Sequence, residues 1–317
     1  MKNREMTQEE RLDYLIRYLC EESVQYRGLR VEKAERRATL RSLMNIRMPG
    51  PVSQKFREIQ DVFLQQEAAE KGIVKVETIP SVREAYGTTG KNSGRIFLWQ
   101  GDITRLSADA IVNAANSQML GCFVPCHGCI DNAIHSAAGL ELREECSEIM
   151  KRQGHETKTG EAVITGAYNL PCRYVLHTVG PIVYGKLTDS HCRQLVSCYK
   201  SCLSLAEEKG LESVVFCCIS TGEFHFPNDK AAKIAVRTVE EYLENSRIER
   251  VVFNVFKDED LHIYEGSKDL LTPTSLTLIL INGSLSFRPY MRRFLESYSL
   301  WIDGTVCLIK GRRFFVK

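Results

Sequence analysis

Residues 101–139 read GDITRLSADAIVNAANSQMLGCFVPCHGCIDNAIHSAAG and carry most of the chemically suggestive side chains of the chain. The extended run ADAIVNAA contains Asn113 and is followed directly by Asn116. A loop rich in cysteine comes next, and a helix begins at IDNAIHSAAG. A strand, a polar loop and a helix in succession form the repeating unit of an α/β protein. This stretch therefore predicts the fold class, and its loop predicts where a site lies.

The same alternation continues on both sides of this stretch. Extended runs occur at RIFLWQG, EAVITGAYN, CRYVLHTVG, SVVFCCIS and RVVFNVF, and helical patterns lie between them at residues 131–153, 191–209 and 228–245. Strands that alternate with helices predict a mostly parallel sheet, with ligands bound beyond the carboxyl ends of its strands. We therefore expect residues 91–266 to form one α/β domain.

Residues 1–90 have a helical rather than an extended period. Thr7 is an expected N-cap, and Glu10 completes a capping box. Apolar residues recur at helical spacing over residues 7–25, 31–48 and 53–71. We expect a helical N-terminal extension that ends in the loop SVREAYGTTGKNSG.

The tail, residues 267–317, contains the apolar run SLTLILI and the basic end KGRRFFVK. Its role stays open between added strands at the domain edge, packing on the N-terminal helices, and association with another chain.

Composition places the chain among ordinary globular proteins. It has 317 residues, of which 44% are hydrophobic and 26% charged, and its net charge is +2. A nearly neutral chain is not expected to be a dedicated nucleic-acid binder. Because the sequence lacks an apolar signal core and any run of about 18 apolar residues, we expect a cytoplasmic protein with no membrane partner. The 12 cysteines are scattered, which favours thiols or metal ligands over disulfides.

One cluster of cysteines stands apart from the others, within residues 122–129. Cys122, Cys126, His127 and Cys129 offer ligands that suit Zn²⁺, and no second Cys/His pair follows at zinc-finger spacing. Three protein ligands with an open position are the pattern of a catalytic zinc, and Cys122, His127 and Cys129 supply three. Cys126 is then a spare or a fourth ligand. The alternative is a loop of ordinary thiols beside a solvated histidine.

Polar residues follow several of the predicted strands. Asp102 is placed to accept a hydrogen bond from an exocyclic amine, although an aspartate in such a place more often caps a turn. Asn113 and Asn116 are able to orient a sugar hydroxyl or a water, although asparagine there is also common in turns. Successive backbone amides in a small-residue loop are able to hold a diphosphate, and such a loop follows SVVFCCI: Ser220, Thr221, Gly222, Glu223 and Phe224.

Asp131 and His135 lie four residues apart at the start of the predicted helix, hence on one face. An aspartate near a helix N-terminus often serves only as a cap. Its position directly after the Cys/His cluster favours a role with a bound substrate.

Together, GDIT, IVNAAN, IDNAIHSAAG, GEAVITGAYNL, YVLHTVGP and STGEFHFP resemble the macrodomain family, a module that binds ADP-ribose. The resemblance spans residues 95–264 and implies a three-layer α/β/α fold with a mixed, mostly parallel central sheet. The loop CFVPCHGC departs from the glycine-rich loop of most macrodomain hydrolases. It is similar to that of the zinc-containing macrodomain hydrolases of microbes, which also carry a helical N-terminal extension.

The resemblance implies an enzyme that removes mono-ADP-ribose from modified proteins, with sirtuin-type ADP-ribosyltransferases as a partner system. It implies one Zn²⁺ per chain, held by Cys122, His127 and Cys129. It implies that the adenine contacts Asp102, Ile103 and Phe256. It implies that the diphosphate contacts Ser220, Thr221, Gly222, Glu223 and Phe224. It implies that the distal ribose contacts Asn113, Asn116, Asp131 and His135. Among the last group, Asn116, Asp131 and His135 are the candidate catalytic residues.

We expect the bond broken to be an ester between an Asp or Glu side chain and C1″ of ADP-ribose. The alternatives are deacetylation of O-acetyl-ADP-ribose and a non-catalytic reader of ADP-ribose. A zinc-structured nucleic-acid module is disfavoured by the net charge of +2 and by the single cluster of ligands.

Overall fold

The computed structural model describes residues 6–266 together with the segments 302–303, 306–309 and 312–315. Residues 6–266 belong to one compact unit, and the three segments belong to a second. In the second unit, the strands β9 (Ile302–Asp303), β10 (Val306–Ile309) and β11 (Arg312–Phe315) form an antiparallel sheet in the order β11-β10-β9. The rest of the tail, whose role the sequence leaves open, lies outside the described residues.

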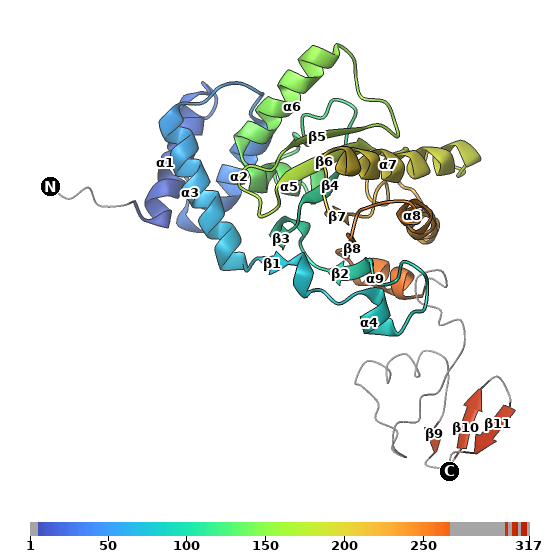
Figure 1. The fold of residues 1–317 in the computed structure, drawn as a ribbon. Helices are drawn as coiled ribbons and strands as arrows, with labels where there is room; N and C mark the ends of the chain where they lie inside the picture. The colour runs from blue at the N-terminus through green and yellow to red at the C-terminus, as the bar shows by residue number, and fades with distance from the viewer. Residues whose placement is uncertain (1–5, 267–301, 304–305, 310–311, 316–317) are drawn as a thin grey trace. The chain divides into compact units, whose positions relative to one another are not determined.

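A six-stranded sheet organises the first unit (Figure 1). Its order is β2-β8-β7-β4-β6-β5, and every neighbouring pair is parallel except β5 with β6. Apolar side chains fill the middle strands because helices cover both faces of a parallel sheet. The strands are β2 (Ile96–Gln100), β4 (Ala110–Ala115), β5 (Ala162–Gly166), β6 (Tyr174–Val179), β7 (Ser213–Phe216) and β8 (Arg250–Val255). The predicted mixed, mostly parallel sheet is confirmed.

Two layers of helices enclose this sheet. The chain moves along the sheet in one direction from β4 to β6 and in the opposite direction from β6 through β7 to β8. Right-handed crossovers therefore place α5 (Ile130–Ala138) and α6 (Leu140–Gln153) on one face. They place α7 (Asp189–Glu208) and α8 (Asn228–Leu243) on the other, and α9 (Asp258–Glu265) contacts β8 and α8. The three-layer α/β/α prediction is confirmed.

The helix predicted over residues 131–153 is broken into α5 and α6 at Gly139. This glycine has a φ of +100°, and a Cβ there would lie 2.7 Å from the side-chain nitrogen of Gln60. Glycine is required because an L side chain is strained at this φ and would collide with a helix of the N-terminal extension.

The N-terminal extension has an apolar core of its own, formed by α1 (Gln8–Glu21), α2 (Arg36–Ile46) and α3 (Gln54–Lys71). Thr7 caps α1 with the expected capping box. A 3₁₀ turn (Lys33–Glu35) precedes α2. The core contains Leu15, Leu19, Leu40, Leu43, Met44, Phe56, Phe63 and Leu64, and Leu140 of α6 completes it. One residue of the α/β domain, Leu140, thus packs into the core of the extension, which is distinct from the core around the sheet.

A connecting segment joins the extension to the sheet. Strand β1 (Val74–Lys75) pairs in parallel with β3 (Leu106–Ser107), and 3₁₀ turns follow β1 (Val76–Thr78) and precede β3 (Ile103–Arg105). The segment expected to be a loop contains α4 (Val82–Tyr86), so that expectation was wrong at this point. Ser81 and Glu84 form a capping box, which the pattern S-x-x-E indicates. Within the described part of the chain, no helix has the length and hydrophobicity of a membrane span.

Replacing Phe56 by alanine should destabilise the whole first unit. Phe56 is fully buried in the core of the extension, and its ring centroid lies 4.6 Å from that of Tyr18. We expect the free energy of unfolding to fall by about 3–5 kcal/mol, measured by denaturant unfolding. Because Leu140 links the two parts, the fall should appear as one shifted transition. A separate early transition, with the remainder unchanged, would contradict coupling of the two parts through Leu140.

Candidate functional site

Residues singled out from the sequence follow four strands that are neighbours in the sheet. Asp102 follows β2, Phe256 follows β8, residues 220–224 follow β7, and Asn116 follows β4. The order β2-β8-β7-β4 places them in a row along one edge. Neighbouring strands are about 4.8 Å apart, so the row is about 14 Å long. A ligand lying along this edge would meet the four groups in that order.

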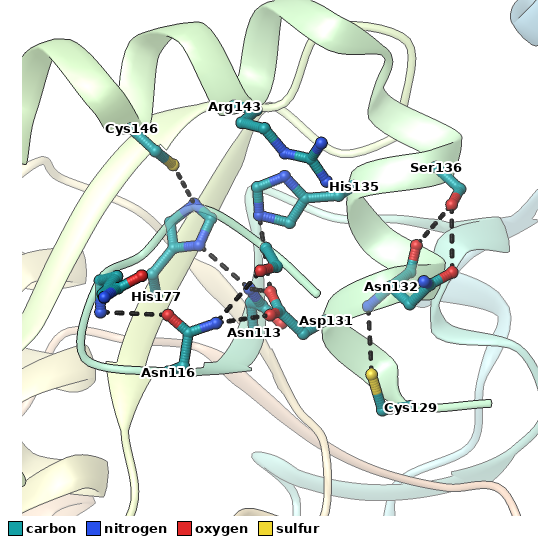
Figure 2. Close-up of polar contacts among 12 residues, drawn as sticks. Asn113, Asn116, Cys129, Asp131, Asn132, His135, Ser136, Arg143, Cys146 and His177 are labelled. Carbon is teal, nitrogen blue, oxygen red and sulfur yellow. Dashed lines mark hydrogen bonds and ion pairs between the residues drawn. The ribbon is translucent and has the colours of Figure 1, made fainter. Parts of the chain in front are cut away.

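Asp131 is a buried carboxylate held by two asparagines (Figure 2). Its Oδ1 accepts a hydrogen bond from Asn113 Nδ2 at 2.8 Å, and Asn116 Nδ2 lies 3.4 Å from its Oδ2. Asn113 belongs to β4, and Asn116 follows that strand directly. Asp131 lies in the first turn of α5, where the free amides of the helix favour a negative charge. Strand β4 and helix α5 thus fix this carboxylate together.

The burial of Asp131 changes its acid strength. Burial raises its pKa to about 6, although the bond from Asn113 and the charge of Arg143 favour the ionised form. His135 Nε2 lies 3.5 Å from Asp131 Oδ1. Burial, with the proximity of His177 and Arg143, lowers the pKa of His135 well below its usual value, so its ring is neutral at pH 7. His135 is enclosed beside Asp131, and its catalytic role stays a prediction.

His177 forms a second polar layer beneath the site. It lies on β6 directly opposite Asn113 of β4. Asn113 Nδ2 donates to His177 Nδ1 at 3.1 Å, so the imidazole proton is on Nε2, which lies 2.9 Å from Thr165 Oγ1. This arrangement fixes the Asn113 amide with its nitrogen toward Asp131. The sequence reasoning missed His177, although a histidine within the apolar strand YVLHTVG was a signal.

Arg143 is a buried cation on α6 that sequence reasoning also missed. Its Nη1 donates to the carbonyl oxygens of Met44, Asn45 and Arg47, at the C-terminal end of α2. Its guanidinium lies 4.4 Å from the ring centroid of Phe123. Burial lowers its pKa to about 10, and the free carbonyls of a helix end favour its positive charge.

The residues predicted as metal ligands converge in the structure. The ligand atoms of Cys122, His127 and Cys129 all lie within 4.8 Å of one another, and Cys122 Sγ is 3.7 Å from His127 Nδ1. Tetrahedral zinc with two sulfur ligands and one nitrogen ligand places the ligand atoms roughly 3.5–3.8 Å apart. All three residues are partly exposed. The donor set and its spacing therefore fit a zinc ion that keeps one position open.

Cys129 also begins helix α5. It is the N-cap residue, and its Sγ accepts from the Asn132 amide at 3.4 Å. Burial raises the pKa of its thiol to about 12. Cys126 is directed elsewhere, because its Sγ lies 3.2 Å from Ser42 Oγ and 3.3 Å from the Ala38 carbonyl oxygen on α2.

Gly121 starts the loop that carries the three ligands. Its φ is +78°, and a Cβ at this position would lie 2.8 Å from the His135 ring. Its carbonyl oxygen accepts from Asn116 Nδ2 at 3.2 Å. Glycine is therefore needed here, since the backbone passes directly over the buried imidazole.

The loop of residues 220–224 has features of an anion site. Ser220 has a φ of +66°, and its buried hydroxyl forms no hydrogen bond within the described part of the chain. Within residues 6–266, the backbone amides of Gly222, Glu223 and Phe224 also donate no hydrogen bond to the protein. Free amides in such a loop bind phosphate oxygens. Glu223 Oε1 lies 3.6 Å from His127 Nε2, so this loop adjoins the ligand cluster.

The residues predicted to meet adenine lie at the other end of the row. Asp102 caps the following 3₁₀ turn, its Oδ1 accepting from the amide and the hydroxyl of Thr104. The Ile103 side chain is buried in the core, which leaves its backbone for a ligand. Phe256 is 74% exposed. Its place after β8, the neighbour of β2, brings it beside Asp102 at the sheet edge.

Known proteins match the chain in sequence and in fold. The Macro domain family matches residues 112–235. The chain is 51% identical over 262 residues to a protein-ADP-ribose hydrolase of Treponema medium, covering 82% of this chain and 98% of that protein. It is 47% identical over 228 residues to a protein-ADP-ribose hydrolase of Staphylococcus aureus, covering 71% and 82%. The Trypanosoma brucei macrodomain in complex with ADP-ribose superposes with a TM-score of 0.55 at 31% identity, covering 74% and 95%.

Replacing His177 by glutamine should weaken the pH dependence of stability. Burial lowers the pKa of His177 to about 3 in the folded protein, whereas it is about 6.5 when unfolded. The unfolded chain therefore binds the extra proton between these values, and the parent loses stability as the pH falls below 6.5. Between pH 7 and pH 5 the parent should lose about 2 kcal/mol more than His177→Gln. Urea unfolding at both pH values measures this, and equal losses would contradict it.

Proposed function

This chain belongs to the macrodomain family and is a hydrolase, and from that premise we propose that it releases mono-ADP-ribose from modified proteins with the aid of a bound zinc ion. The observation that carries the proposal is the placement of two thiols and an imidazole beside a buried carboxylate. Cys129, one of the three, is the N-cap of the helix that presents Asp131. Neither a metal cluster nor a buried acid is needed for binding ADP-ribose alone.

The row of groups along the sheet edge supports ADP-ribose as the ligand. The adenine would lie between Asp102 and Phe256, at β2 and β8. The diphosphate would be held by the free amides of residues 220–224, after β7. The distal ribose would then reach β4 and α5, where Asn116 and Asp131 lie. The sheet order therefore directs the reacting end of the ligand toward the Cys/His cluster.

The zinc would be held by Cys122, His127 and Cys129. Two thiolates and an imidazole are ligands that zinc prefers, and an open fourth position is typical of its catalytic sites. Glu223, 3.6 Å from His127 Nε2, is placed to orient the ring as carboxylates do in zinc proteins. When bound, zinc supplies a Lewis acid that polarises an oxygen of the substrate or of water.

The residues of the chain would hold the reactants in place. We propose that the bond broken joins C1″ of ADP-ribose to a carboxylate oxygen of an Asp or Glu side chain. Water adds across this bond, giving free ADP-ribose and the free carboxylic acid. Asn116, which contacts both Asp131 and the Gly121 carbonyl, would fix the distal ribose. Asp131, ionised above about pH 6, would orient the attacking water or accept its proton.

The substrate would come from an ADP-ribosyltransferase that modifies acidic side chains. The resemblance to microbial macrodomain hydrolases favours a sirtuin-type transferase as that enzyme. O-acetyl-ADP-ribose carries the same ADP-ribose group on a small ester, so assays of the protein substrate and of this molecule should be run side by side.

Purified protein should contain one zinc per chain, because the cluster has ligands for one ion. Cys129→Ser should lose the zinc, whereas Cys126→Ser should keep it, since the Cys126 thiol contacts α2 rather than the cluster. Elemental analysis of the parent and both variants measures this. A parent without zinc removes the metal from the proposal, and loss of zinc in Cys126→Ser would make that residue a fourth ligand.

Asp131→Asn should lower turnover at least about tenfold while ADP-ribose still binds. The substitution keeps the shape of the side chain but removes its charge next to the reacting bond, whereas affinity depends mainly on the adenine and the diphosphate. Release of ADP-ribose from an Asp/Glu-modified protein and calorimetric titration with ADP-ribose measure the two quantities.

Asp109→Asn is the matched control for this experiment. Asp109 also accepts several hydrogen bonds, but it precedes β4, at the opposite end of that strand. Its substitution should leave turnover at the parental value. Parental turnover in a folded Asp131→Asn would refute the proposed role, and a parent that binds ADP-ribose without hydrolysing either substrate would be a reader.

A further inference from the structure

We infer that helix α2 of the N-terminal extension holds the Cys/His loop, residues 122–129, in its ligand-binding geometry, with Arg41 as the positioning residue. This inference rests on the proposed zinc site for its consequence, but the contacts that carry it lie within the described protein. They join a segment outside the α/β domain to the backbone of the loop that carries the ligands, including the carbonyl oxygen of His127.

The guanidinium of Arg41 holds this loop at two points, one directly and one through Asn132. Arg41 Nη2 donates to the His127 carbonyl oxygen at 3.0 Å, so it holds the backbone of a predicted ligand directly. Arg41 Nε and Nη2 also donate to Asn132 Oδ1, at 3.0 and 2.6 Å. Asn132 is completely buried, and its Nδ2 donates to the Val124 carbonyl oxygen at 2.9 Å. Arg41 therefore fixes His127 directly and Val124 through Asn132.

Cys126 provides a second attachment to the same helix. Its backbone amide donates to Asn45 Oδ1 at 2.9 Å, and its thiol donates to the Ala38 carbonyl oxygen. Cys126 has a φ of +52°, a conformation that is unfavourable for residues other than glycine. The hydrogen bond that the Cys126 amide donates to Asn45 supports this strained turn, which directs the thiol away from the ligand cluster and toward α2.

Asn45 in turn ties this contact to helix α5. It is 1% exposed, and its Nδ2 donates to Ser136 Oγ at 2.9 Å. Ser136 Oγ donates to the Asn132 carbonyl oxygen, and Figure 2 shows both residues on the helix that Cys129 begins. Successive turns of α2, at Arg41 and Asn45, therefore hold the loop and the helix that follows it as one body.

The irregular backbone of the loop explains why support from α2 should strengthen metal binding. Residues 122–129 form neither helix nor strand, so an unsupported loop would lose conformational entropy on binding a metal. Holding the backbone beforehand removes that cost from the binding step. Outer groups that orient metal ligands typically change metal affinity 10- to 100-fold when mutated. Arg41 acts through His127 and Asn132, and is a positioning residue rather than a ligand.

The test compares Arg41→Met with Arg37→Met. Arg37 lies one turn earlier on α2, and its guanidinium bonds to Glu67 of α3 without touching the loop. Both variants lose one arginine fork of the same helix. In protein stripped of metal by a chelator, hydrogen exchange of residues 122–133 should quicken at least about tenfold in Arg41→Met and stay parental in Arg37→Met. Zinc affinity, measured against a chromophoric chelator, should fall about 10- to 100-fold in Arg41→Met alone.

The possible outcomes test the support of the loop by Arg41 and the proposed zinc site separately. If a folded Arg41→Met exchanges its amide hydrogens at the parental rate, Arg41 does not hold the loop, whatever the zinc result. If Arg41→Met exchanges faster but binds zinc with the parental affinity, Arg41 holds the loop without positioning the metal ligands. If the parent itself binds no zinc, the proposed zinc site is wrong. Faster hydrogen exchange in Arg41→Met alone would still show that Arg41 holds the loop. Should Arg41→Met not fold, Arg41→Lys, which keeps the charge but loses the two-pronged geometry, takes its place with the same expectations.

Discussion

The burial of the Asp131 carboxylate governs the arrangement of the groups around it. A charge removed from water is unfavourable unless hydrogen bonds or opposite charges replace its hydration. Asn113 and Asn116 supply the hydrogen bonds, and Arg143 supplies a nearby positive charge. The compensation is incomplete, because the pKa remains raised to about 6. Asp131 is therefore stabilised as a carboxylate by its neighbours but takes up a proton near pH 6.

Each compensating group depends in turn on a different layer of the fold. The Asn113 amide is oriented by His177, which brings in strand β6. The Arg143 guanidinium donates hydrogen bonds to carbonyl oxygens at the end of α2, so its position depends on the N-terminal extension. One carboxylate therefore connects the central strand, its neighbour, the covering helices and the extension. Leu140 of α6 adds an apolar contact between the α/β domain and the extension to these polar ones.

The sequence predicted features that depend on neighbouring residues and on strand order. The cap at Thr7, the parallel sheet, the convergence of Cys122, His127 and Cys129, and the row along the sheet edge were all accessible from short patterns. The break at Gly139 was not, because glycine is tolerated inside helices and the Gln60 side chain, which leaves no room for a Cβ there, lies far away in the sequence. Arg41, Asn45 and Arg143 were also missed, since their partners lie 81 to 99 residues away. No local pattern distinguishes them from surface arginines and asparagines.

The long separation between α2 and α5 has a consequence for how the protein is made. Arg41 and Asn132 are 91 positions apart, and Arg143 and Asn45 are 98 apart. As the nascent chain leaves the ribosome, α2 emerges long before the segment that receives its polar side chains. The extension must wait with Leu140 still missing from its core, and contacts this distant in sequence form slowly. The contacts that join α2 to α5 and α6 therefore form only after the chain has been made as far as α6, and a polypeptide truncated before α6 lacks both Leu140 and Arg143.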